Sequence, residues 1–295
     1  VADKPSFIRG SEYLTLGEIH TYRIYWNKQL EALRDIDDGV KLIHDTLGGL
    51  QRLRNTYIVF TSDNGFFYGE HRLTGGKFLA YEPATHLPLL IRGPGIKAGT
   101  STGELAGNID LAPTILELAG VEADKSIDGR SLVPYMKDPA LRSRRPILFE
   151  SFVETADVEA NGEVTAQRPV RELKRRNTDG ASASIVAPPK DYLGIRLGPY
   201  KYIEWPSGEK ELYDVTKDPF ELNNVVRVRN LSPIRAFLHA QLIRLETCVG
   251  RTCQEVAPPF PLTLEQQRKV DKQRREEERQ KEREREEKRH HKRKG

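Results

Sequence analysis

The chain has 295 residues, of which 37% are hydrophobic and 31% are charged, so it can bury a sizeable core in spite of its polar average. Its formal net charge is +4, and the excess comes from residues 261–295, which carry fourteen Lys/Arg and nine Asp/Glu. The remainder carries 33 basic and 34 acidic residues, so the basic pI does not predict a specific nucleic-acid-binding domain. No run of eighteen apolar residues and no signal-peptide pattern occurs, and we expect no membrane span.

The first part of the chain predicts the order helix, strand, strand, helix, which is typical of a layered α/β domain. Residues 27–53 predict an amphipathic helix with one buried face, because apolar residues recur every three or four positions. The short apolar runs at 56–60 and 87–91 predict two core strands. Residues 110–121 predict a second helix, with Asp110 as its candidate N-cap. The periodic apolar residues of the first helix are Leu30, Leu33, Ile36, Val40, Ile43, Leu47 and Leu50.

From about residue 146, short strand-like runs predict a smaller α+β unit. A Gly-Pro-Tyr turn at 198–200 joins two of the runs in a hairpin, and residues 233–246 predict a helix that covers one face of the sheet. Residues 154–190 are polar and lack periodicity, so we interpret them as a long exposed loop. The predicted strands lie at 146–150, 191–197, 200–205 and 210–215.

We therefore expect three parts, with boundaries at 1–145, 146–260 and 261–295. The last part is a charged tail whose only apolar residue after Leu264 is Val270, so it cannot form a coiled-coil seam. A solvated single helix or a disordered segment is the expected state. Contact between this basic tail and a polyanion is the functional alternative.

Cys248 and Cys253 are the two cysteines of the chain. A short glycine-containing loop separates them, and a disulfide could close it, which favours an oxidising compartment. The alternative is two free thiols in an intracellular protein.

The stretch after the first predicted strand is the candidate functional site. Asp63 and Asn64 follow that strand directly, and Gly65 allows the backbone to bend there. A carboxylate beside an amide oxygen offers two hard ligands for Ca²⁺ or Mg²⁺. Lys77 adds a cation that could meet an anionic oxygen. Taken singly, these residues favour an ordinary turn and a surface lysine.

The longer pattern closely resembles the type I sulfatase family. Four stretches carry the resemblance in this order: YIVFTSDNGFFYGEHRL, then GK, then YEPATHLPLLIRGPGI, then NIDLAPTILELAGV. DIDDGVKLIHDTLG upstream, and IRLGPYKYIEW and ELYDVTKDPFELNNV downstream, extend it. The resemblance covers about residues 3–255, with 154–190 and the tail outside it.

This resemblance implies an alkaline-phosphatase-like α/β fold, incomplete at the N-terminus, with a smaller C-terminal α+β subdomain. It further implies a Ca²⁺ ion held by three aspartates and an asparagine, of which Asp63 and Asn64 match the later two. Lys77 matches the lysine that holds the sulfate group near the leaving oxygen. The family's nucleophile is a formylglycine made from the cysteine of a C-x-P-x-R motif.

The sequence departs from the family pattern in several places. Neither cysteine begins a C-x-P-x-R motif, and the pair Asp37 and Asp38 belongs to a helix instead of a strand end. We therefore expect an N-terminally truncated sulfatase, or one half of a split gene, that is inactive alone. His86 stands where many relatives have an arginine. His86 and His71 are candidate substrate contacts, although structural roles are favoured for both.

Two rival functions remain at this stage. A phosphatase or phosphodiesterase of the same superfamily is disfavoured by Asn64, because a neutral amide oxygen suits one hard ion better than a second zinc. A non-catalytic anion-binding protein is the other rival, supported by the missing nucleophile. For the sulfatase we expect a sulfated small molecule or carbohydrate as substrate and a secreted, periplasmic or lysosomal-like location.

Overall fold

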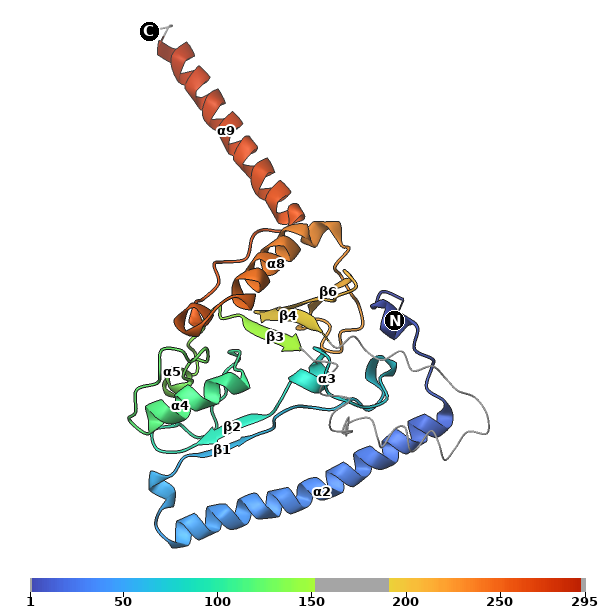
Figure 1. Cartoon of the computed structure of the whole chain (residues 1–295). Coiled ribbons are helices and arrows are strands. Elements are labelled where there is room, and N and C mark those ends of the chain that lie inside the picture. Colours follow the sequence, from blue (N-terminus) through green and yellow to red (C-terminus); the bar gives the residue numbers. More distant parts are fainter. Residues whose placement is uncertain (1, 152–190, 293–295) are drawn as a thin grey trace.

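The computed structural model describes residues 2–151 and 191–292, and within these ranges the chain forms two sheets with helices around them (Figure 1). One sheet pairs β1 with β2, and the other has the order β3-β4-β5-β6; all the pairings are antiparallel. The strands are β1 (Ile58–Thr61), β2 (Leu89–Arg92), β3 (Ile147–Ser151), β4 (Tyr192–Leu197), β5 (Tyr200–Glu204) and β6 (Lys210–Asp214).

The helices differ greatly in length. The longest, α2, starts at a capping box in which the Glu18 N–H donates to Thr15 Oγ1 and the Thr15 N–H donates to the Glu18 carboxylate. None of the described helices combines the length and the apolar character that a membrane span needs. The helices are α1 (Ser6–Arg9), α2 (Leu16–Gly49), α3 (Glu82–Thr85), α4 (Leu111–Leu118), α5 (Val133–Lys137), α8 (Ser232–Glu246) and α9 (Leu264–Lys292).

The four-stranded sheet and helix α8 confirm the elements predicted from residue 146 onward. Gly198, with φ of 51°, makes the tight turn between β4 and β5. Along β4, Ile195 and Leu197 are buried in one cluster with Leu238 of α8, so α8 covers that face of the sheet. The predicted loop at 154–190 lies outside the described residues.

The opposite face of this sheet shares a core with the first part of the chain. Tyr81, which precedes α3, is buried in one cluster with Ile203 of β5 and Tyr213 of β6. Helix α1 closes the same cluster, because the Phe7 ring meets the Trp205 ring edge-on at 4.9 Å. The long connection between β1 and β2 therefore packs directly on the second sheet.

The expected burial of the first helix and of the first two strands is wrong for the described residues. Helix α2 has no buried residue, although its apolar positions have the predicted spacing. All β1 residues are partly exposed, and Leu90 of β2 is 59% exposed. Periodicity identifies an apolar face, but burial also requires a surface packed against it, and the described elements do not provide one here.

Asp110 precedes α4 as predicted, but its side chain does not cap that helix. This carboxylate is fully buried, forms an ion pair with Arg145 at 2.5 Å, and accepts hydrogen bonds from the backbone N–H groups of Gly107 and Arg130. A buried carboxylate is held most strongly by a cation, which explains why it points away from the helix N-terminus.

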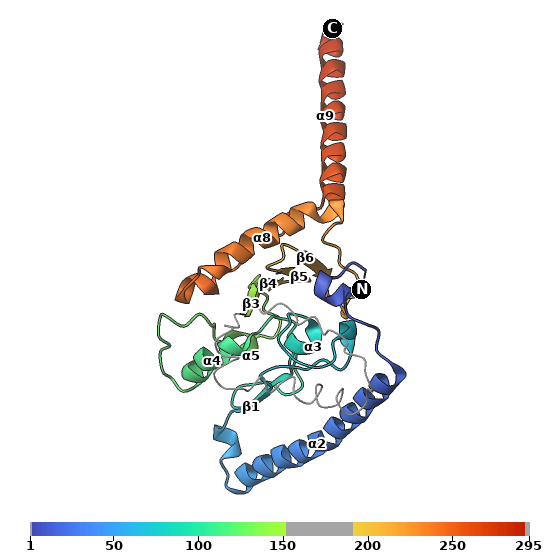
Figure 2. The ribbon, with the colours of Figure 1, turned by 45° about the vertical axis from the view of Figure 1, so that its right-hand side comes forward.

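At the C-terminal end, a disulfide joins Cys248 and Cys253 just after α8. Helix α9 then leaves the body as a single helix (Figure 2). Ion pairs such as Lys269 with Glu265 at 2.8 Å support it, and Asn230 Oδ1 accepts a hydrogen bond from the Glu265 N–H at its start. The helical form of the predicted tail is thus the one observed.

Glu211 is the buried acid of the shared core. Its carboxylate accepts hydrogen bonds from the Tyr81 hydroxyl at 2.8 Å, from Trp205 Nε1 at 2.7 Å and from the Tyr213 hydroxyl. Burial nevertheless raises the pKa of Glu211 to about 7, against these three donors. The folded state therefore holds a proton that the unfolded state releases at lower pH.

The Glu211→Gln variant should remove one component of the pH dependence of stability. Because the folded pKa of Glu211 is about 7 and its ordinary value is 4.5, this group's stabilisation is complete below pH 4.5 and is lost as the pH rises through 7. Urea unfolding from pH 4 to 8 should show the wild type losing up to about 3 kcal/mol relative to the variant. Parallel pH profiles for the two proteins would contradict this assignment.

Candidate functional site

The loop that follows β1 brings together three residues singled out from the sequence. Lys77 Nζ donates a hydrogen bond to Asn64 Oδ1 at 2.8 Å and lies 3.9 Å from Asp63 Oδ2. The Asp63 side chain is 83% exposed and that of Lys77 is 38% exposed, so the group opens to solvent. A carboxylate, an amide oxygen and an ammonium group therefore share one accessible surface.

Local hydrogen bonds set the directions of the two oxygen-bearing side chains. The Asn64 N–H donates to Asp63 Oδ1 at 2.9 Å where the chain turns at Asp63, so this carboxylate folds back onto the peptide that follows it. Asn64 Nδ2 donates to the Gly65 carbonyl at 2.9 Å, so Oδ1 faces Lys77. Ser62 Oγ donates to the Asn64 carbonyl at 2.9 Å and holds the turn from the strand side.

Position 65 requires a glycine because another backbone approaches it closely, and not because of the bend expected from the sequence. Its backbone does not lie in the left-handed region. The N–H groups of Gly65 and Phe66 instead donate to the carbonyls of Ala84 and Pro83 in α3, at 2.9 and 3.0 Å. A Cβ atom at Gly65 would lie 2.0 Å from the Pro83 oxygen, so only glycine permits this approach.

Two further contacts place the rest of the loop. Phe67 is buried, and its N–H donates to the Gly76 carbonyl at 3.1 Å, which fixes the backbone beside Lys77. Asn108 Nδ2 donates to the carbonyls of Ser62 and Asp63, both at 3.2 Å. Sequence analysis did not single out Asn108, although it begins one of the stretches that carry the family resemblance.

The two histidines lie in contrasting environments. Among the described residues, neither forms a hydrogen bond or an ion pair with Asp63, Asn64 or Lys77. His71 is buried, its ring lies 4.4 Å from the Tyr81 ring, and burial lowers the pKa of its imidazole to about 4. His86 is 79% exposed and pairs with Glu82 at 3.1 Å. This arrangement favours a loop-shaping role for His71.

Asp63 and Asn64 have the donor chemistry that a hard divalent cation requires, namely one carboxylate and one amide oxygen on adjacent residues. No group of three or more His, Cys, Asp or Glu side chains suited to a metal occurs in the part of the chain that the structure describes. The fit is therefore partial, because Asp63 and Asn64 offer two side chains with suitable oxygens and a calcium ion takes about six to eight oxygen ligands. The Lys77 ammonium occupies the space beside them.

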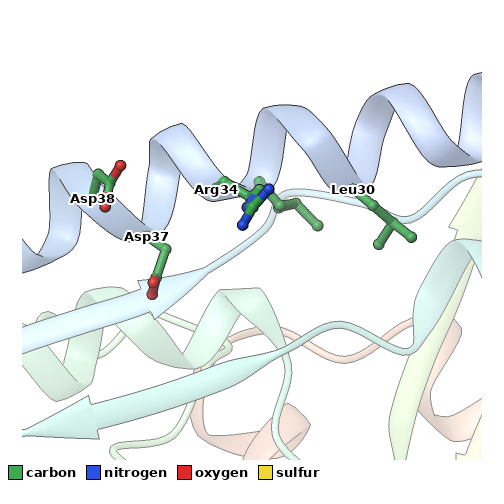
Figure 3. A pocket seen from close by; sticks show the side chains of 5 residues that line it. Leu30, Arg34, Asp37 and Asp38 are labelled. Carbon is green, nitrogen blue, oxygen red and sulfur yellow. The ribbon is translucent and has the colours of Figure 1, made fainter.

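A pocket of about 490 Å³ lies elsewhere, on α2 (Figure 3). Only side chains of this helix line it, including Asp37 and Asp38, which belong to the helix as the sequence predicts. Its lining contains none of the residues of the loop after β1.

Comparison with known proteins assigns this fold and loop to a family. Residues 20–121 match the sulfatase family model. An extracellular sulfatase homologue of Drosophila melanogaster is 34% identical over 194 residues, which is 65% of this chain and 17% of that protein. The human N-acetylglucosamine-6-sulfatase is 32% identical over 242 residues, which is 78% of this chain and 42% of that protein.

Two solved structures have a similar fold. One is a protein in complex with its substrate D-glucosamine-2-N,6-O-disulfate, with 28% identity and a TM-score of 0.58, covering 75% of this chain and 39% of that one. The other is a phosphonate monoester hydrolase of Agrobacterium radiobacter, with 26% identity and a TM-score of 0.54, covering 72% of this chain and 39% of that one.

The fold is thus the α/β fold of sulfatases and related hydrolases, as the sequence predicts. Within this class, the chain carries a sulfatase family domain over residues 20–121 and is similar to sulfatases beyond it. It spans less than half the length of the curated relatives that it matches.

Proposed function

We propose that this chain contributes part of the active site of a sulfuric ester hydrolase, in which Asp63 and Asn64 bind Ca²⁺ and Lys77 binds the sulfate group. One observation carries the proposal: Lys77 lies 2.8 Å from Asn64 and 3.9 Å from Asp63, although thirteen positions separate it from Asn64. An exposed ammonium group fixed beside hard oxygen donors is suited to a small anionic group such as a sulfate ester.

Each residue has a distinct task in this reaction. Hydrolysis of a sulfate ester builds negative charge on the leaving oxygen, and the Lys77 ammonium stabilises that charge in place. Asp63 and Asn64 would hold a Ca²⁺ ion, which would supply positive charge to the sulfate group; Mg²⁺ suits the same donors. No C-x-P-x-R segment occurs among the 295 residues, so the formylglycine nucleophile would come from a segment outside them.

The substrate class that we propose is a sulfated carbohydrate. The supporting evidence is the similarity to an N-acetylglucosamine-6-sulfatase and to a protein whose substrate is D-glucosamine-2-N,6-O-disulfate. In this proposal residues 1–145 are the C-terminal part of the catalytic domain and 146–260 the small subdomain. The disulfide between Cys248 and Cys253 supports a secreted or otherwise oxidising location.

A phosphoryl-transfer activity is the second candidate, supported by the similarity to a phosphonate monoester hydrolase. Asn64 weighs against it, because an amide oxygen suits one hard ion better than a zinc pair. Paired assays with a sulfate and a phosphate monoester of the same alcohol separate the two activities. A purely anion-binding role would give binding of both esters and hydrolysis of neither.

Calcium titration tests the metal assignment. Isothermal calorimetry of the 295-residue chain should detect weak Ca²⁺ binding, because few ligand charges give low affinity. The Asp63→Ala variant should abolish it, while Asp35→Ala, on the exposed surface of α2, should leave it unchanged. Equal binding by wild type and Asp63→Ala would remove Asp63 from the site.

The role of Lys77 requires a complete enzyme. We expect these 295 residues by themselves to hydrolyse no sulfate ester, and coexpression with a sulfatase segment that carries C-x-P-x-R and with the formylglycine-generating enzyme to give activity. In that enzyme Lys77→Ala should lower kcat at least about 10²-fold, the usual scale for losing one charge-stabilising group. The exposed Lys97→Ala is the matched control. Hydrolysis by the 295 residues alone would contradict the need for a separate nucleophile segment. An unchanged kcat in the Lys77→Ala enzyme would contradict the role of Lys77.

The charged tail should act independently of the body. Deleting residues 261–295 should abolish salt-sensitive retention on heparin, because the net positive charge lies there, and should leave the circular dichroism and melting of the body intact. Phe260, which packs in the core beside α8, stays in the shortened chain. Retention without the tail, or unfolding of the body, would show that the tail is not a separate polyanion-binding appendage.

A further inference from the structure

A buried ion network joins the second sheet to α3. Lys201 of β5 is fully buried, and its Nζ lies 2.6 Å from Glu82 Oε1 and 2.9 Å from Glu221 Oε1. Besides these two ion pairs, Lys201 Nζ donates a hydrogen bond to Thr85 Oγ1 at 3.3 Å. Glu82 and Thr85 are the first and last residues of α3, so Lys201 contacts both ends of this short helix.

The pKa values of the two carboxylates of this network shift in opposite directions, and burial raises the pKa of Glu221 above its ordinary value in spite of Lys201. Burial pushes the pKa of Glu82 upward, but the Lys201 charge outweighs it, and the pKa lies below its ordinary value. Arg196 of β4 adds a second positive charge near the two carboxylates. Removing Lys201 would leave the buried carboxylate of Glu221 and the partly buried one of Glu82 with Arg196 as the nearby cation, which is unfavourable.

Glu221 acts on the backbone of α3 as well. Its Oε2 accepts a hydrogen bond at 2.6 Å from the N–H of Glu82, the first residue of that helix. Glu221 itself has φ of 53°, a left-handed conformation that is uncommon for a residue with a side chain. The chain after β6 therefore adopts a costly backbone geometry at the residue whose carboxylate points to α3.

The other side of α3 faces the site. The carbonyls of Pro83 and Ala84 accept the hydrogen bonds of Phe66 and Gly65, immediately after Asp63 and Asn64 in the chain. The close approach leaves no room for a side chain at Gly65, so these two hydrogen bonds join backbone directly to backbone. A displacement of α3 must therefore displace the backbone that carries Asp63 and Asn64.

We propose that Lys201, together with Glu82 and Glu221, is a positioning group that sets the place of Asp63 and Asn64 through the backbone of α3. The second sheet thereby takes part in assembling the site without touching the substrate. This role of Lys201 rests on the proposed function only in that Asp63 and Asn64 are taken as ligands of Ca²⁺.

Amide hydrogen exchange of the full chain tests the mechanical link without any metal. Lys201→Met should accelerate exchange of the Gly65 and Phe66 amides at least about tenfold, the scale of losing one charged interaction, and leave the amides of β4 and β5 protected. Glu82→Gln, which keeps the shape of the side chain, should have the same effect to a smaller degree. Lys210→Met is the matched control, because Lys210 forms a partly exposed ion pair with Glu204 on the same sheet.

A folded Lys201→Met protein with unchanged exchange at Gly65 and Phe66 would overturn the proposal. So would an equal acceleration across β4 and β5, because that pattern indicates general destabilisation. If Lys201→Met does not fold, Glu82→Gln decides by the same two criteria.

A double-mutant cycle on calcium affinity then separates positioning from stability. Lys201→Met and Gly65→Ala should each weaken Ca²⁺ binding, and the double variant should bind no more weakly than Gly65→Ala, because both changes act through the same contact. Additive losses of affinity would contradict transmission through α3. If the wild-type chain binds no Ca²⁺, the proposed metal site fails, whereas the exchange experiment still decides whether Lys201 positions the loop.

Discussion

Burial of Tyr81 is the constraint on which the rest of this structure depends. Its ring lies over His71, packs against Tyr213 of the second sheet, and directs its hydroxyl to Glu211. The residue after Tyr81 opens α3, which in turn holds Gly65. One fully buried aromatic residue thus places the loop after β1 against the second sheet, and the two parts of the chain share one core instead of meeting at a separable interface.

The second sheet could be predicted from sequence because its rules are local. Alternating side chains, a glycine turn and a proline at the start of α8 specify the elements without reference to the rest of the chain. The exposure of α2, β1 and β2 could not be predicted in this way, since an apolar pattern indicates which face is apolar and not which surface covers it. Asp110 illustrates the same limit: its position before α4 was predictable, but its partner Arg145 is 35 positions away.

The residues of the candidate site could be predicted from a sequence pattern, whereas the contacts that hold them in place could not. Asp63, Asn64 and Lys77 lie within fifteen positions, and the geometry that joins them fits the resemblance. The supporting contacts are long-range: Lys201 is 119 positions from Glu82. The available sequence signal was Lys201 between two tyrosines of a predicted strand, because a lysine that such a strand buries requires partners from elsewhere in the chain.

Helix α2 has a consequence for how the protein behaves in solution. A helix of 34 residues is about 50 Å long, and here it presents Leu30, Leu33 and Ile36 to water along one side. An exposed apolar stripe on a helix favours self-association, so we expect the chain handled alone to associate at high concentration and to bind fluorescent hydrophobic dyes. Its colloidal stability is governed by this helix, whatever the thermodynamic stability of the shared core.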